Sequence, residues 1–134
     1  MNAHPGPESD LRQALLHLAY WHLERGHLHK SETLSRGLLT LDPGCGEAWY
    51  YLGASLRRRG HISDAAQAFV QATQLGDHRP EVWLALAEAK ILCGDARTAR
   101  AAIAQVTRAL PKTDRRFRRA CALLRMCPPE AVVY

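Results

Sequence analysis

The feature that most constrains this chain is a recurrence of residue types at intervals of 34 positions along its 134 residues. The recurring positions are Gly26, Gly60 and Gly94; Leu18, Leu52 and Leu86; Trp49, Trp83 and Phe117; and the small residues Ala19, Gly53 and Ala87. A fixed period of about 20–50 residues is typical of proteins that stack one supersecondary unit along an axis. The recurrence therefore predicts a short solenoid rather than a single globular core.

Each unit is expected to be a pair of helices joined by a glycine turn. In the second unit an apolar pattern over about 47–59 ends at Gly60, and glycine readily takes the left-handed conformation that closes a helix. A second helix is expected over about 63–75, with its apolar residues on one face. Trp49 and Phe69 are expected to fill the space between these two helices.

The second unit carries the most complete pattern, with Trp49, Leu52, Gly53, Leu56, Gly60, Ala65, Phe69 and Ala72. This pattern resembles the tetratricopeptide repeat. The third unit follows it, whereas the first unit has Leu15 in place of tryptophan, and Ser31 and Ser35 in its second helix. The resemblance implies an all-α fold, in which three helix pairs at about 12–45, 46–79 and 80–113 stack as a short solenoid.

The two ends of the chain are expected to depart from the repeat. A C-terminal capping helix is predicted over 114–126, because Phe117, Ala120, Cys121 and Leu124 continue the apolar pattern of a first helix. The repeat domain then covers 11–126. Residues 1–10 are rich in proline, glycine and polar residues, and 127–134 contain two adjacent prolines. Both segments are expected to be flexible tails.

Several classes of function are excluded by the composition and by missing motifs. No stretch approaches the roughly 20 apolar residues of a membrane-spanning helix. The N-terminus lacks the basic start and apolar run of a secretion signal, so a cytoplasmic protein with free cysteines is expected. No nucleophile elbow, phosphate loop or paired-carboxylate arrangement is present, so an enzyme is not expected.

Four histidines gather in the first unit, at His17, His22, His27 and His29. Two metal ligands on one helix face need a spacing of three or four residues, and His17 and His22 are five apart. Solvated or locally hydrogen-bonded histidines are therefore the preferred interpretation. No metal or cofactor is expected.

The resemblance also implies a binding surface, because the first helix of each pair lines the concave groove of tetratricopeptide arrays. The positions carried over are Gln13, Leu16, Tyr20, Leu23, Tyr50, Ala54, Arg57, Leu84, Glu88 and Ile91. Their mostly apolar and aromatic character favours a hydrophobic segment of another protein as the ligand. For Leu16, Leu84 and Ile91 the alternative is that they only fill space within the superhelix.

A second candidate surface is the arginine cluster Arg115, Arg116, Arg118 and Arg119 on the predicted capping helix. It is interpreted as a solvated cap, as a contact for an acidic partner protein or, less favourably, as a nucleic-acid contact. The net charge of +5 permits an acidic partner without requiring one.

The chain also resembles the tetratricopeptide chaperones of bacterial type III secretion, with the YscY-like branch the most similar. The matching features are a short first helix leading to Gly26, the run 38–43, Trp83 with Leu84, and the turn at Gly94. The resemblance implies a cytoplasmic chaperone that holds a hydrophobic segment of a secretion component before export, working as a hetero-oligomer or homodimer. The alternative is a scaffold or adaptor that assembles a secretion or pilus complex.

Overall fold

The computed structural model describes residues 6–128, and this part of the chain folds into helices without strands. The helices are α1 (Pro7–Glu24), α2 (Leu28–Leu41), α3 (Gly46–Arg58), α4 (Ile62–Gln74), α5 (Pro80–Leu92), α6 (Ala96–Ala109) and α7 (Arg115–Met126). Among them, none has both the length and the apolarity to cross a bilayer. The predicted all-α class is confirmed.

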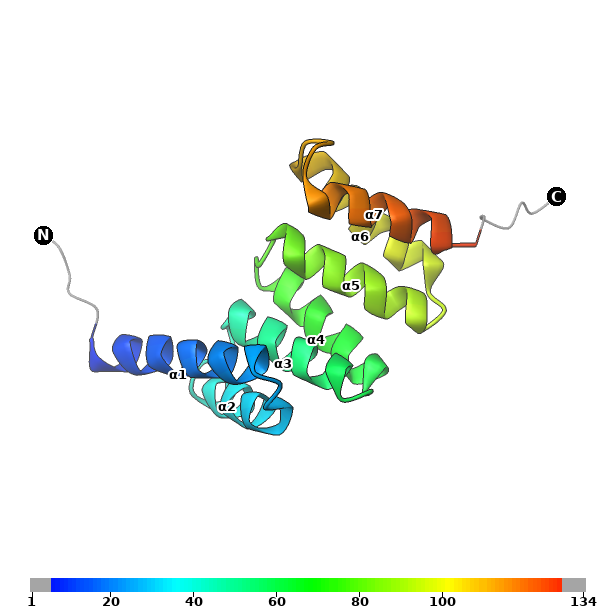
Figure 1. Cartoon of the computed structure of the whole chain (residues 1–134). Coiled ribbons are helices and arrows are strands. Elements are labelled where there is room, and N and C mark those ends of the chain that lie inside the picture. The colour runs from blue at the N-terminus through cyan, green and yellow to red at the C-terminus, as the bar shows by residue number, and fades with distance from the viewer. Residues whose placement is uncertain (1–5, 129–134) are drawn as a thin grey trace, which may run out of the picture.

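The helices stack as pairs, α1 with α2, α3 with α4 and α5 with α6 (Figure 1). Each first helix also packs beside the first helix of the next pair, so that α1, α3, α5 and α7 form one layer. Helix α7 closes the stack against α5 and α6. This arrangement confirms the predicted solenoid of three pairs followed by one more helix.

A repeated turn generates the pairs, and it depends on the recurring glycines. Gly60 has a φ of 89°, and the next amide, that of His61, donates to the carbonyl of Leu56 over 2.8 Å. Gly94 has a φ of 81° and makes the equivalent turn between α5 and α6. A left-handed residue followed by this six-residue hydrogen bond satisfies carbonyls that the ending helix leaves open. The 34-residue period therefore reflects the repeated turn between helices as well as the repeated core positions.

The core of the second pair is built around Phe69, which is fully buried. Its ring lies against Gly53, where an added Cβ would stand 2.6 Å from a ring carbon. Trp49 is only half-buried, and its indole N–H donates to the carbonyl of Pro43 over 3.1 Å. Trp49 packs against the edge of the same core, as expected, but Phe69 alone occupies its fully buried centre.

The first pair is joined by polar contacts. The hydroxyl of Ser31 is buried and donates to the carbonyl of Ala19 across the pair over 2.9 Å. Ser35, also buried, donates to the carbonyl of Ser31 over 2.8 Å. These two serines stand where the second pair has Ala65 and Phe69, so hydrogen bonds replace an aromatic ring at this position.

Helix α1 begins at Pro7, four residues before the predicted start of the domain, and its 18 residues are not the short first helix that was expected. Proline suits the first helical position because its missing N–H would have no helical partner there, and Glu8 and Asp10 in the first turn favour the positive end of the helix dipole. Residues 7–10 are therefore helix rather than tail. Residues 1–5 lie outside the described range.

The capping helix is present, but its buried face differs from the predicted one. Ala120 and Leu123 are buried, whereas Leu124 is 45% exposed. Cys127 is also buried, and its thiol lies 3.5 Å from the carbonyl of Leu123. The packed part of the domain therefore reaches at least to this cysteine, one residue past the predicted boundary. The rest of the predicted tail, from residue 129 on, lies outside the described residues.

Candidate functional site

The inner layer, formed by α1, α3, α5 and α7, brings the predicted groove residues onto neighbouring helices. Leu16 and Leu23 are buried, at 6% and 7% exposure, so most of each side chain packs within the helix array. The other eight predicted residues are half-buried or exposed. Their participation in binding stays a prediction, because position alone shows only that they are reachable.

A row of aromatic rings runs across the first two pairs. The centroids of Tyr20 and Tyr51 are 6.0 Å apart, those of Tyr51 and Tyr50 are 5.7 Å apart, and Tyr50 continues the row to Phe69 at 5.9 Å. Burial raises the pKa of Tyr50 and of Tyr51 above the ordinary value, so both phenols stay neutral at physiological pH. The row therefore offers a neutral, largely apolar surface whose outermost ring, Tyr20, is half exposed.

Beside this row lies a hollow of about 220 Å³ between α1 and α3. It is lined by Gln13, Leu16, His17, Tyr20, Glu47 and Tyr51. Sequence reasoning missed the last of these, although a signal was present. Tyr51 follows Glu47 by four positions and precedes Arg58 by seven, so the three share one face of α3. That face meets α1, where Arg58 donates to the carbonyl of Leu23 over 2.6 Å.

The second half of the layer is ionic. Glu88 of α5 accepts from Arg57 of α3 over 2.5 Å and from Nε of Arg119 of α7 over 2.8 Å. The Glu88 side chain is only 14% exposed, so one carboxylate is held between two guanidinium groups from the helices on either side. Within the described residues, Nε of Arg57 is buried without a hydrogen-bond partner. This triad carries a net positive charge and can accept an additional anionic group.

The four arginines predicted as a basic surface divide into two sets. Arg116 pairs with Glu81 and with Asp114, and Arg119 pairs with Glu88, so both are turned toward α5. Glu81 and Glu88 are seven positions apart and therefore lie on one face of α5, the face beside α7. Arg115 and Arg118 are exposed. The four residues do not form one free basic surface, because two of them hold the capping helix in place.

The histidines of the first pair form a local contact. The Nδ1 atoms of His22 and His27 are 3.1 Å apart, and the Trp21 ring meets the His22 ring edge-on at 4.9 Å. The guanidinium of Arg25 lies 3.8 Å from the centre of the Trp21 ring. Partial burial and the positive surroundings lower the pKa of His22. No group of three potential metal ligands occurs in the part of the chain that the structure describes.

The family model described as Tetratricopeptide repeat matches residues 56–124, which is more than half of the chain. Together with the stacked helix pairs and their glycine turns, this match defines the class of protein. The chain belongs to the tetratricopeptide repeat family. No curated protein sequence matches it significantly.

Among solved structures, the fold is similar to that of the type III secretion translocator chaperone SycD of Yersinia enterocolitica, with a TM-score of 0.78, 18% identity, and coverage of 87% of this chain and 83% of that one. PcrH from Pseudomonas aeruginosa gives a TM-score of 0.75 at 20% identity, covering 91% of this chain and 93% of that one. The O-GlcNAc transferase of Thermobaculum terrenum reaches 0.80 at 19% identity, covering 90% of this chain and 23% of that one. At these identities the likeness is one of fold.

Proposed function

We propose that this chain is a chaperone of type III secretion, which holds a hydrophobic segment of a secretion component along its inner helix layer in the cytoplasm until export. The observation that carries the proposal is the aromatic row of Tyr20, Tyr51 and Tyr50 beside the hollow between α1 and α3. The structural likeness supports it, because PcrH has been solved with the chaperone binding region of PopD and SycD with a peptide of the translocator YopD. Membership of the YscY-like branch stays a prediction.

The surface fits an extended or helical segment that has an apolar side chain at one end and an acidic one further along. The hollow at α1 and α3 has room for a leucine or an aromatic ring, and burying such a side chain there contributes about 1.5–3 kcal/mol to binding. The triad of Arg57, Glu88 and Arg119 lies further along the same layer and carries the positive charge that an acidic side chain requires. Binding of this kind uses no covalent chemistry, so the proposed role is not enzymatic.

Tyr20 is the position for a decisive test, because it is 49% exposed and faces the hollow. Tyr20→Glu introduces a charge that has to be desolvated whenever an apolar segment docks, and we expect affinity to fall at least about tenfold. Tyr50 is less suitable because it packs against the buried Phe69, so a charge there would also disturb the fold.

The measurement is a calorimetric titration with the partner protein that copurifies with the wild-type chain. Leu75→Glu is the matched control, because Leu75 is 43% exposed at the end of α4, away from the helices that carry the aromatic row. Both variants should keep wild-type helix content and melting behaviour. Unchanged affinity in Tyr20→Glu would reject the inner layer as the binding site.

A further inference from the structure

Helix α7 occupies the place of the first helix of a fourth pair, and within residues 6–128 no second helix follows it. Phe117, Cys121 and Leu124 come 34 positions after Trp83, Ala87 and Lys90, and 68 after Trp49, Gly53 and Leu56. In the second pair these positions meet α4, where Gly53 touches Phe69 and Leu56 is 4% exposed. On α7 Cys121 is only half-buried and Leu124 is 45% exposed. The face of α7 that a partner helix would cover is therefore open.

Helix α6 shows the same incompleteness on its side toward the end of the stack. Thr73 of α4 is 9% exposed because the third pair packs over it, whereas Thr107, 34 positions later on α6, is half-buried. Thr107 together with Phe117, Cys121 and Leu124 is called the terminal face here. The equivalent residues of the second pair lie between helices, whereas the residues of the terminal face remain accessible to solvent.

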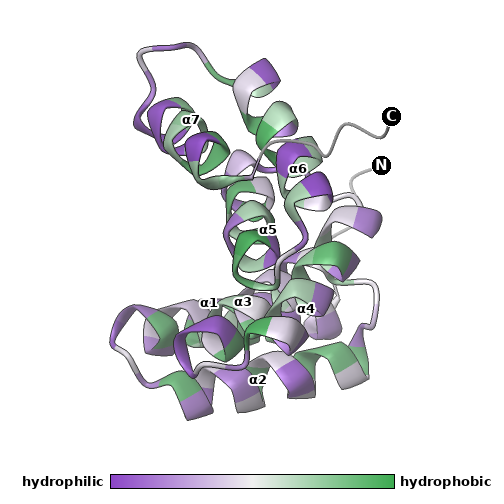
Figure 2. Ribbon diagram, turned by 90° about the vertical axis from the view of Figure 1, so that its right-hand side faces the viewer, coloured by the Kyte–Doolittle hydropathy of each residue, from purple (hydrophilic) through white to green (hydrophobic). Residues whose placement is uncertain are grey.

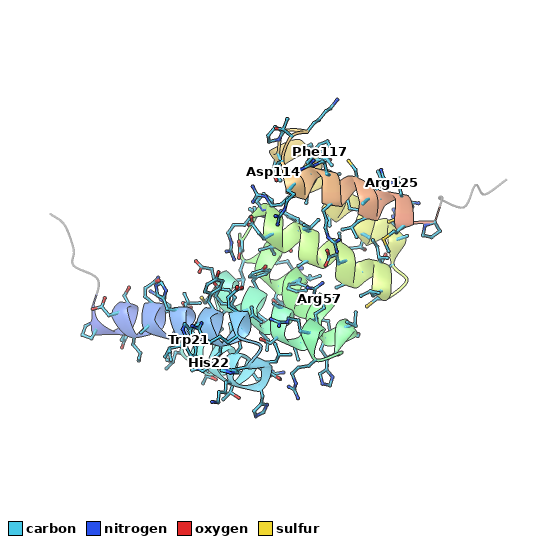
Figure 3. The ribbon with its side chains drawn as sticks, viewed as in Figure 1. Trp21, His22, Arg57, Asp114, Phe117 and Arg125 are labelled. Carbon is cyan, nitrogen blue, oxygen red and sulfur yellow. The ribbon has the colours of Figure 1, made fainter. Side chains whose placement is uncertain are left out.

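Positive charge is concentrated in residues 96–126, the segment that carries the terminal face. Residues 96–126 contain nine arginines and lysines and one acidic residue, a net charge of +8, whereas the rest of the chain contains nine cationic and twelve acidic residues, a net charge of −3. Figure 2 shows hydrophilic residues along much of α7, and Figure 3 places Arg125 on the side of α7 turned away from α5, with Phe117 near the start of the helix. The exposed Arg118 and Arg125, seven positions apart on one face of α7, lie beside the terminal face.

We propose that the terminal face binds an acidic amphipathic helix of a partner protein, which lies beside α7 as the second helix lies beside the first in each of the three pairs. The register defines the apolar side of this helix, since α4 places Phe69 against Gly53 and a comparable side chain would meet Cys121. The charge asymmetry defines its polar side, since carboxylates flanking the apolar side would meet Arg118 and Arg125. The binding mode is that of a helix laid into an apolar surface between two others.

The apolar content of the terminal face argues for a helix over a nucleic acid. A phosphate backbone would pair with the arginines but would leave Leu124 and Cys121 in water. Binding of single strands relies on exposed aromatic rings for base stacking, and the only aromatic residue between 96 and 126 is the half-buried Phe117. The terminal face is also separate from the aromatic row and its hollow, which lie on α1 and α3.

The test uses the full chain and a synthetic helical probe. The probe is a lactam-stabilised peptide with the sequence of residues 62–75, the segment that serves as second helix in the second pair, carrying Gln67→Glu, Gln71→Glu and Gln74→Glu. The three glutamines are exposed in α4 and lie on one face of that helix. A control peptide carries lysine at the same three positions. Fluorescence anisotropy of each labelled peptide is recorded during titration with the chain.

We expect the glutamate peptide to bind at least about tenfold more tightly than the lysine peptide, and its affinity to fall as salt is added. Arg118→Glu should weaken it about fivefold or more, because it replaces an attraction with a repulsion. The matched control is Lys30→Glu on α2, which changes the same charge at an exposed position in the first pair. Cys121→Trp should abolish binding by filling the terminal face, while Cys93→Trp, at the exposed end of α5, should not.

Equal affinity for the two peptides, or full binding by Arg118→Glu and Cys121→Trp, would overturn the proposal. Two further arms identify other occupants that would also overturn it. One is tight binding of a 20-base-pair DNA duplex that Arg118→Glu abolishes, with no binding of the glutamate peptide. The other is self-association of the chain, seen by sedimentation, that Cys121→Trp removes. Tyr20→Glu should leave peptide binding unchanged, because Tyr20 lies in the aromatic row on the first two pairs, away from the terminal face.

Discussion

The first and second helix pairs solve the same packing problem with different chemistry. Both bring two helices close together at small residues, Ala19 and Ser31 in the first pair and Gly53 and Ala65 in the second. In the second pair the Phe69 ring then packs directly against Gly53, in the space left by the absent side chain, which is called the glycine notch here. In the first pair a serine hydroxyl crosses to a backbone carbonyl. Both pairs require the two helices to approach closely, but the side chain that fills the contact can be an aromatic ring or a hydroxyl.

The difference has an energetic consequence. A buried aromatic ring contributes through the apolar area that it removes from water, which is large, whereas a neutral hydrogen bond contributes about 0.5–1.5 kcal/mol net. The first pair also relies on ion pairs, between Arg12 and Asp42 within the pair, and between Glu32 and Arg59 of the next pair. We therefore expect the second pair to be the stable centre of the array and the first pair to respond more to pH and salt.

The largest effect is expected from Phe69→Ala, which empties the core of the second pair. Truncating a fully buried phenylalanine costs about 3–5 kcal/mol of unfolding free energy. Urea denaturation followed by circular dichroism measures this loss. Trp49→Ala is the comparison variant and should cost clearly less, since Trp49 is half-buried. Equal costs would mean that the packing around Phe69 is not the centre of the pair.

Gly53→Ala tests the glycine notch itself. Alanine normally stabilises a helix interior by up to about 1 kcal/mol relative to glycine. Here the new Cβ would stand 2.6 Å from the buried Phe69 ring, so we expect a net destabilisation of about 1–3 kcal/mol. Gly37→Ala on the exposed face of α2 is the matched control, because nothing lies within 4 Å of its Cβ. The two variants should shift the urea midpoint in opposite directions, and shifts of the same sign would contradict a tight notch.

Ser31→Ala probes the polar junction of the first pair. It removes the hydroxyl that donates to Ala19 and should cost about 0.5–1.5 kcal/mol. Thr33→Ala, at an exposed position two residues later, removes a hydroxyl that bonds only within α2 and should have a smaller effect. A thermal melt of both variants distinguishes them. If Ser31→Ala were as costly as Phe69→Ala, the distinction between the two pairs would fail.

The smallest effect is expected from acid, and it should fall on the first pair. Burial opposes ionisation of Glu32, but hydrogen bonds from Arg36 and Arg59 outweigh it and hold the pKa of this carboxyl below its ordinary value of 4.5. A lowered folded-state pKa stabilises the protein above the unfolded value, and this contribution disappears as the pH falls through the folded-state pKa. The melting temperature of wild type should therefore exceed that of Glu32→Gln near neutral pH and converge with it in acid. Glu24→Gln, at an exposed position on α1, is the control, and a constant difference for Glu32→Gln would exclude this linkage.

Much of the fold could be predicted from the sequence, because the glycine turns and the small positions are local requirements that recur with the period. Features that depend on neighbouring elements could not. Leu18 has the register of the buried Leu52, but it is 46% exposed, because among the described helices α1 packs only against α2 and α3, whereas α3 has neighbours on both sides. Arg116 and Arg119 were expected in a free basic surface, yet α5 presents Glu81 and Glu88 to them. The sequence did not predict Tyr51 as a binding residue, because the tetratricopeptide pattern assigns no role to its position.

The bridge from Arg57 through Glu88 to Arg119 has a mechanical consequence. It spans α3, α5 and α7, and so ties three successive helices of the inner layer together. A solenoid curves toward the side on which its units lie closest together. We therefore expect these ion pairs to increase the curvature of the second half of the array. Salt screens partly exposed ion pairs, and the Debye length falls to about 3 Å at 1 M. The ion pairs should therefore weaken at high ionic strength, and the curvature of the array should decrease.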